Sequence, residues 1–254
     1  MVFNGESAGA YTIRSDIVAE SLRREVHFPS GGETLYGYWL RQPGGAPRVT
    51  IVFSHGKDGD LSRDAKWAHA EALWQCGVDV LTYDYRGFGR STGTSKDAST
   101  LATDASAALT YALTQPGVTE QRVVSYAHSL GSVPGISMAV SAPNLRALVV
   151  ESGFSNGQAM ANTANPLGMP VTWLLKDPMQ NTRKIASVAM PVLIIHGTSD
   201  AQIPVEQGRA LYAAAPQPKQ LLIVNGATHA DIPSVLGIPQ FCSTVRAFIH
   251  ADSP

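Results

Sequence analysis

From Val49 onwards, short apolar runs alternate with longer amphipathic stretches. The runs are apolar on both faces, which is typical of parallel strands covered by helices. They are Val49–Phe53, Val78–Tyr83, Arg122–Tyr126, Ala147–Val150, Val192–Ile195 and Gln220–Val224. Between and after them we expect helices over Leu61–Cys76, Ala98–Leu113, Leu130–Ala142, Val205–Ala214 and Phe241–His250. This repeated order predicts an α/β fold with a mostly parallel, doubly wound sheet.

The N-terminal part has a different pattern. Glu25–Phe28 and Thr34–Arg41 alternate apolar and polar residues around a Pro-Ser-Gly-Gly turn, which predicts an antiparallel hairpin at a sheet edge. With the six later runs, this makes a sheet of eight strands. Met1–Leu22 is polar and rich in Gly, Ser and charged residues. We therefore expect an N-terminal arm over residues 1–24 and a single α/β domain over residues 25–254.

One segment, Ser155–Ala189, interrupts the alternation and is too long for a simple loop. Its large apolar side chains have no obvious core of their own, so we interpret it as a small lid inserted at about residues 155–189. The alternative is an ordinary crossover helix with a loop. The apolar residues concerned are Met160, Met169, Trp173, Leu174, Leu175 and Met179.

Composition narrows the function classes. The 254 residues are 44% apolar, as in ordinary globular domains, and the formal net charge is −1. The charges are interleaved and form no basic stripe, so we expect no nucleic-acid partner. No apolar stretch reaches the roughly 18–20 residues that span a bilayer. Met1–Glu25 has no apolar signal region, so we expect a cytoplasmic location unless the chain has been trimmed.

The two cysteines, Cys76 and Cys242, lie far apart in the sequence and form no C-x-x-C or metal-type spacing. We expect both to be buried apolar residues in helices rather than a disulfide.

The segment Ala127-His128-Ser129-Leu130-Gly131 carries the strongest chemical signal. It lies between a predicted strand and a predicted helix. A serine at such a tight turn, with small residues two positions before and after it, forms a nucleophile elbow. The usual motif is G-x-S-x-G, and Ala127 replaces its first glycine. The alternative for Ser129 alone is a helix N-cap.

Two partners follow in the order Ser, Asp, His. Asp200 lies just after the predicted strand Val192–Ile195, and His229 follows Gln220–Val224 in the same way. Open parallel sheets place their sites at this edge. We expect Ser129 as nucleophile, His229 as general base and Asp200 as the residue that orients the imidazole. Taken singly, Asp200 could be a turn residue and His229 a solvated loop histidine.

Two backbone N–H groups would form the oxyanion hole, one from Leu130 and one from Lys57 in the loop after Val49–Phe53. No metal and no organic cofactor is expected. We interpret His55 as bracing that loop. Glu151 is a weaker alternative to Asp200.

Two further interpretations concern neighbouring residues. We interpret Asp84 and Arg86 as a pair that fixes their loop. The role of His128, whether bracing the turn or near the pocket, stays open.

Several ordered blocks resemble the α/β-hydrolase superfamily, within it the compact abhydrolase-domain serine hydrolases that include protein depalmitoylases and many bacterial members. The blocks are Ser54–Gly56, Asp84–Ser91, Ser129–Gly131, Glu151–Ser155, Ile195–Asp200 and Gly226–His229. The resemblance implies the α/β-hydrolase fold and hydrolysis of acyl esters or thioesters without a cofactor.

We therefore expect a serine hydrolase that cleaves carboxylic esters through an acyl-enzyme. Thioesterase or depalmitoylase activity is the alternative, and peptidase activity a weaker one. A non-catalytic binding module of the same fold is the alternative from another class. The expected partner is a small-molecule or acyl ester substrate, and the oligomeric state stays open.

Overall fold

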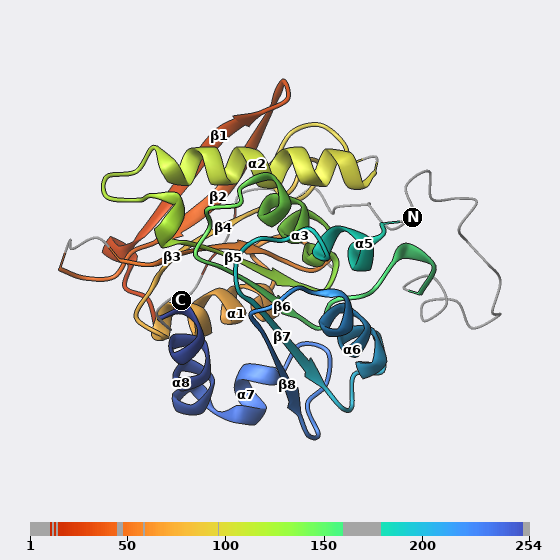
Figure 1. Cartoon of the computed structure of the whole chain (residues 1–254). Helices are drawn as coiled ribbons and strands as arrows, with labels where there is room; N and C mark the ends of the chain where they lie inside the picture. Colours follow the sequence, from red (N-terminus) through yellow and green to blue (C-terminus); the bar gives the residue numbers. More distant parts are fainter. Residues whose placement is uncertain are drawn as a thin grey trace.

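One sheet of eight strands, in the order β1-β2-β4-β3-β5-β6-β7-β8, organises the protein (Figure 1). The computed structural model describes residues 11, 13, 15–44, 48–57, 59–95, 97–159 and 179–250. The hairpin β1 (Arg23–Ser30) and β2 (Glu33–Leu40) is antiparallel, and β2 pairs antiparallel with β4 (Asp79–Tyr83). The other pairings are parallel. The remaining strands of the sheet are β3 (Thr50–Ser54), β5 (Val123–His128), β6 (Ala147–Glu151), β7 (Val192–Gly197) and β8 (Lys219–Val224).

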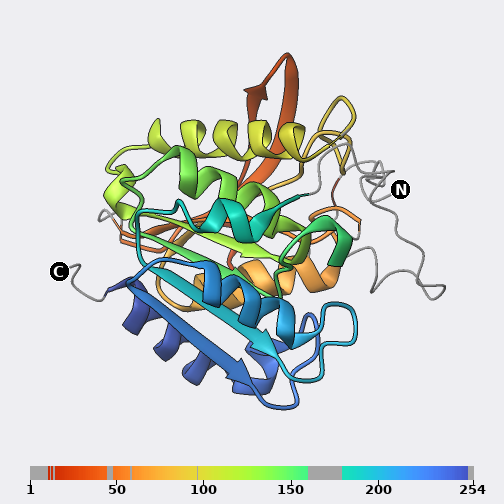
Figure 2. The same ribbon diagram turned by 45° about the vertical axis from the view of Figure 1, so that its right-hand side comes forward.

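Helices cover both faces of the sheet, as Figures 1 and 2 show. One hydrophobic cluster joins a face to α2 (Ala98–Leu113), α3 (Ser132–Ser141), α5 (Asn181–Ile185) and α6 (Val205–Ala214). A second cluster joins the opposite face to α1 (Asp64–Gln75), α7 (Ile232–Leu236) and α8 (Ile238–Ile249). The expected α/β-hydrolase architecture is confirmed.

The central strands are buried on both sides because side chains alternate between the two clusters. In β5, Val123 packs in the α2–α3 cluster, and Val124 and Tyr126 pack in the α1–α8 cluster. All six residues of β5 are buried. This explains why the parallel strands appear in the sequence as continuous apolar runs.

The predicted elements are confirmed with small shifts at their ends. Asp97 shows why α2 begins at Ala98, because its side chain accepts the Thr100 N–H at 2.9 Å and completes a capping box. The pattern did not predict α5 or α7, each of which has only five residues.

The structure tests the lid and the arm only in part. Met160, Met169, Trp173, Leu174 and Leu175 lie outside the described residues, so the lid stays a prediction. Met179 is buried and belongs to the α2–α3 cluster. Residues 1–10 of the arm also lie outside the described part.

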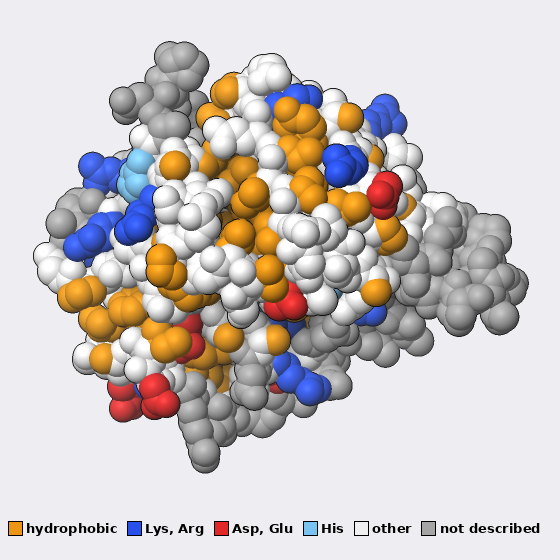
Figure 3. All heavy atoms as spheres, turned by 90° about the horizontal axis from the view of Figure 1, so that it is seen from below, with side chains coloured by type: hydrophobic (Ala, Val, Ile, Leu, Met, Phe, Trp, Pro, Cys, Tyr) orange, Lys and Arg blue, Asp and Glu red, His pale blue; other side chains and the backbone are white. Residues whose placement is uncertain are grey.

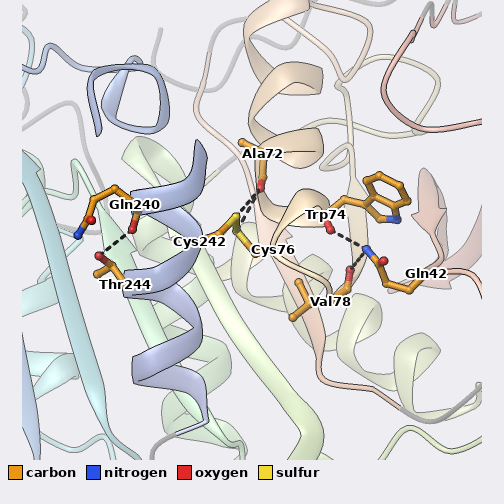
Figure 4. The surroundings of a disulfide bond; sticks show 8 residues. All are labelled: Gln42, Ala72, Trp74, Cys76, Val78, Gln240, Cys242 and Thr244. Atoms are coloured by element: carbon orange, nitrogen blue, oxygen red, sulfur yellow. Dashed lines mark hydrogen bonds between the residues drawn. A yellow bond between two sulfur atoms is a disulfide. The ribbon is translucent and has the colours of Figure 1, made fainter. Parts of the chain in front are cut away.

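The expectation for the cysteines is wrong. Cys76 caps the C-terminus of α1, Cys242 lies in α8, and the two form a disulfide with a Cα–Cα distance of 4.7 Å (Figure 4). The 166 residues between them conceal this contact in the sequence. The bond forms because α1 and α8 pack side by side on the same face of the sheet.

The surface carries both signs of charge. On the face drawn in Figure 3, Lys and Arg side chains occur together with Asp and Glu and with apolar groups. In the described part of the chain, no helix has the length and hydropathy needed to cross a membrane.

Candidate active site

Ser129 lies at the sharp turn between β5 and α3. Its φ is +55°, an uncommon value for a residue other than glycine. A Cβ on Gly131 would lie 1.9 Å from the carbonyl oxygen of Ser54, and one on Gly135 would lie 2.6 Å from the Cβ of Ala127. The turn therefore requires glycine at 131, and Gly135 makes room for an alanine at 127.

The structure brings Ser129, His229 and Asp200 together. The Oγ of Ser129 lies 2.8 Å from Nε2 of His229, and Nδ1 of His229 lies 2.8 Å from Oδ2 of Asp200. All three residues are buried or nearly so, with 5–9% of their surface exposed. If Nδ1 carries the proton toward the carboxylate, Nε2 is free to accept the hydroxyl proton of Ser129.

The loop after β7 fixes Asp200 firmly. Its Oδ1 accepts the backbone N–H groups of Gln202 at 3.0 Å and Ile203 at 2.8 Å. Burial raises the pKa of Asp200, but the neighbouring imidazoles and backbone N–H groups outweigh it, so the pKa lies well below its usual range. Asp200 is therefore a carboxylate at neutral pH.

His196 is a buried neighbour of Asp200 for which the sequence predicted no role. Its Nε2 donates to the carbonyl of Ile203 at 2.8 Å and lies 3.4 Å from Oδ2 of Asp200. A Cβ on Gly208 of α6 would lie 2.5 Å from its Nδ1, so the helix packs directly against the ring. The only signal in the sequence was its position four residues before Asp200.

The loop after β3 approaches the nucleophile closely. A Cβ on Gly56 would lie 3.4 Å from the Cβ of Ser129, so the backbone there runs beside the serine. Lys57 follows in that loop, and Leu130 follows Ser129 in the elbow. This is the placement that an oxyanion hole requires, and the roles of the two N–H groups stay predictions.

His55 braces this loop, as expected. It is fully buried, its Nδ1 contacts the carbonyl of Gly56 at 2.6 Å, and its Nε2 lies 3.1 Å from Oδ1 of Asp84. Asp84 and Arg86 do not form the expected pair. Arg86 instead binds Asp104 of α2, with Nη2 2.7 Å from Oδ1, because the two side chains leave their loop in different directions.

His128 braces the site by a hydrogen bond to the backbone of His229. Its Nε2 lies 2.8 Å from the backbone carbonyl oxygen of His229, and since a carbonyl only accepts, Nε2 is the donor. Burial and the neighbouring His69 lower the pKa of His128 to about 3, so the ring is neutral. Two consecutive residues thus hold His229: His128 binds the backbone carbonyl of His229, and Ser129 contacts the His229 ring.

Glu151 does not reach His229 through a hydrogen bond. It ends β6, accepts the Tyr126 hydroxyl, and lies 3.1 Å from Nε2 of His69. Within the described residues, Asp200 is the acid hydrogen-bonded to the His229 ring. The geometry therefore favours Asp200 over Glu151.

Comparisons with known proteins agree with this architecture. A family model described as serine aminopeptidase, S33, matches residues 45–184, more than half of the chain. The chain belongs to this α/β-hydrolase family. The matched residues include Ser129, whereas Asp200 and His229 lie beyond them.

Relatives and solved structures extend the match along most of the chain. Protein YfhR of Salmonella typhi is 33% identical over 215 residues, which cover 79% of this chain and 72% of that protein. The α/β-hydrolase domain-containing protein 17C of Xenopus tropicalis is 31% identical over 209 residues, 82% of this chain and 63% of that protein.

Among solved structures, the Pyrococcus furiosus esterase Pf2001 superposes with a TM-score of 0.79 at 18% identity and covers 98% of both chains. Est1E of Butyrivibrio proteoclasticus superposes with a TM-score of 0.72 at 20% identity, covering 89% of this chain and 99% of its own. At these identities, the likeness shows the shared fold.

Proposed function

We propose that the protein is a serine hydrolase that cleaves carboxylic esters through an acyl-enzyme. The observation that carries this proposal is the chain of two 2.8 Å contacts that joins Ser129, His229 and Asp200. The positive φ of Ser129 and the close approach of Gly56 also support it. The solved structure Pf2001, which has the same fold, bears the name esterase.

The contacts support a two-step mechanism. Ser129 Oγ attacks the ester carbonyl carbon while His229 Nε2 takes the hydroxyl proton, and the backbone N–H groups of Leu130 and Lys57 hold the oxyanion. The tetrahedral intermediate then collapses, and the leaving alkoxide takes the proton from His229. A water molecule, deprotonated by the same imidazole, then attacks the acyl carbon. The bond between that carbon and Ser129 Oγ breaks, Oγ takes the proton back from His229, and the acid is released. The Asp200 carboxylate stabilises the imidazolium in both steps.

Peptide hydrolysis is a second candidate, because the matching family model is described as a serine aminopeptidase. The same three residues would act, with His229 protonating an amine instead of an alcohol. Thioester hydrolysis, expected from the resemblance to depalmitoylases, requires the same groups. The geometry of Ser129, His229 and Asp200 serves all three leaving groups equally.

A substrate series separates these candidates. Hydrolysis of p-nitrophenyl esters from acetyl to palmitoyl should be measured with the parent and with Ser129→Ala, beside matched thioesters and aminoacyl p-nitroanilides. We expect ester turnover that falls by about 10⁴-fold or more in Ser129→Ala, because members of such a triad act as a unit.

Equal ester rates in the two proteins would contradict the proposal. Serine-dependent turnover of the anilides alone would favour the peptidase. Serine-dependent turnover of thioesters over oxygen esters of the same acyl group would favour the thioesterase.

A further inference from the structure

A second group of histidine and carboxylate side chains lies next to the nucleophile and includes His128, the residue before Ser129. His69 of α1, His128 at the end of β5 and Glu151 at the end of β6 each offer a ligand atom, and these atoms lie within 4.8 Å of one another. The residues are 5%, 9% and 0% exposed. Three elements that are distant in sequence therefore converge on one buried point.

The polar atoms of this group are not fully satisfied by the protein. Oε1 of Glu151 has no hydrogen-bond partner among the described residues, and neither has Nε2 of His69. That nitrogen lies 3.1 Å from Oε2 of Glu151, without the geometry of a hydrogen bond. Because an unpartnered buried polar atom is costly, these two atoms call for a partner that the described residues do not supply.

The chemistry of the donor set points to a cation as that ligand. Glu151 is 0% exposed, and its Oε1 has no hydrogen-bond donor among the described residues. A buried carboxylate oxygen needs a hydrogen-bond donor or a metal ion as its partner. Imidazole nitrogens beside a carboxylate favour the metal ion.

The surrounding contacts resemble the support that metal ligands receive. The Nε2–H of His128 is held by the carbonyl of His229, and the Tyr126 hydroxyl donates to Glu151. Hydrogen bonds of this kind orient imidazole and carboxylate ligands around metal ions. A neutral imidazole that donates from Nε2 keeps a lone pair on Nδ1.

We propose that His69, His128 and Glu151 form a buried binding site for a divalent transition-metal ion of the zinc class. Two imidazole nitrogens and a carboxylate oxygen are typical zinc ligands. The free second oxygen of Glu151 is available as a further ligand. Ligand atoms about 2.0–2.1 Å from a tetrahedral zinc lie roughly 3.4 Å apart, so the most distant ligand atoms would move closer together on binding.

This site goes beyond the proposed hydrolase reaction and does not depend on it. No metal could be predicted from the sequence, because the three ligands are separated by long stretches without any metal-type spacing.

Metal binding by the full chain tests the proposal directly. Protein prepared without a histidine tag is treated with a chelator and titrated with Zn²⁺. The bound metal is measured by inductively coupled plasma mass spectrometry. Co²⁺ then replaces Zn²⁺ as a spectroscopic probe, because tetrahedral Co²⁺ absorbs visible light much more strongly than octahedral Co²⁺. We expect one equivalent of metal, the tetrahedral Co²⁺ spectrum and a higher melting temperature with Zn²⁺.

Two variants test the ligands, and a third is a control. Glu151→Gln removes the anionic ligand, and His69→Phe keeps a ring that can stack on Phe53. Each should lose the tetrahedral Co²⁺ spectrum and bind Zn²⁺ at least tenfold more weakly. His27→Ala, at an exposed histidine in β1, is the control for adventitious binding and should behave like the parent.

The parent titration decides the matter even if a variant does not fold. Less than a tenth of an equivalent bound by the parent would overturn the proposal, and the group would then be a purely structural contact between Glu151 and His69. Binding by the parent that persists unchanged in folded Glu151→Gln and His69→Phe would overturn it as well, since the metal would then lie elsewhere.

Discussion

At the scale of single residues, the site depends on a clamp around His229. His128 and Ser129 are consecutive, yet one binds the backbone of His229 and the other binds its ring, both at 2.8 Å. A base held at two points loses little freedom when the reaction begins. His128 is therefore a positioning residue, and its effect should appear in the chemical step rather than in substrate binding.

We predict that His128→Leu lowers kcat by roughly tenfold or more with little change in KM, because misplacing a base costs rate. His128→Gln, whose side-chain amide can still donate to the His229 carbonyl, should recover part of the loss. Steady-state kinetics with an activated ester check this, and melting temperatures verify folding. Equal kcat values for the parent and His128→Leu would contradict the clamp.

The sequence allowed Ser129, Asp200 and His229 to be predicted because each follows a strand of the same parallel sheet. The direction of the sheet brings such residues to one edge. The contacts of His196 and His69 could not be predicted from the sequence. Their contacts depend on how α6 and α1 turn their faces toward the sheet, which no local spacing encodes.

At the scale of elements, the pairing of α1 with α8 is the feature that sequence patterns concealed. Both helices were predicted, and their cysteines were expected to be separate buried residues. Packing on one face of the sheet places the two residues close enough to bond. The disulfide closes a loop that contains most of the α/β domain, including Ser129 and Asp200.

We predict that replacing both cysteines with alanine lowers the free energy of unfolding by about 2–4 kcal/mol, because the cross-link limits the entropy of the unfolded chain. Urea unfolding of the parent and of the Cys76→Ala/Cys242→Ala variant measures this difference. A thiol assay on denatured, unreduced protein is the control. Two free thiols per chain and equal stabilities would contradict the prediction.

The same bond bears on location. Disulfides persist in oxidising compartments and are rare in the cytosol, so it argues against the cytoplasmic location that we expected. That location stays a prediction, and the thiol assay on protein taken directly from its native cells tests it.

At the scale of the whole molecule, the buried charge of Glu151 links stability to pH. His69, His128 and Tyr126 face this carboxylate, and its pKa lies at about 2 in the folded protein against an ordinary value of 4.5. A carboxyl group whose pKa is lowered by folding stabilises the folded state above the ordinary pKa. This contribution disappears as the pH falls from about 4.5 toward 2.

In metal-free buffer, we therefore expect Glu151→Gln to be less stable than the parent at pH 7, with a gap that narrows by pH 3. Urea unfolding of both proteins at the two pH values measures the gap. An exposed acid in α6, replaced as Glu206→Gln, serves as the control and should show a much smaller change with pH. A gap for Glu151→Gln that stays constant would contradict the account.

The most direct test of the central claim is covalent labelling of Ser129. Folded protein is treated with a fluorophosphonate probe, and the modified peptide is identified by mass spectrometry. The account predicts one label, on Ser129, that is absent in Ser129→Ala and much slower in His229→Gln. Labelling of another serine, or equal labelling of the parent and Ser129→Ala, would contradict the assignment of Ser129 as the activated nucleophile.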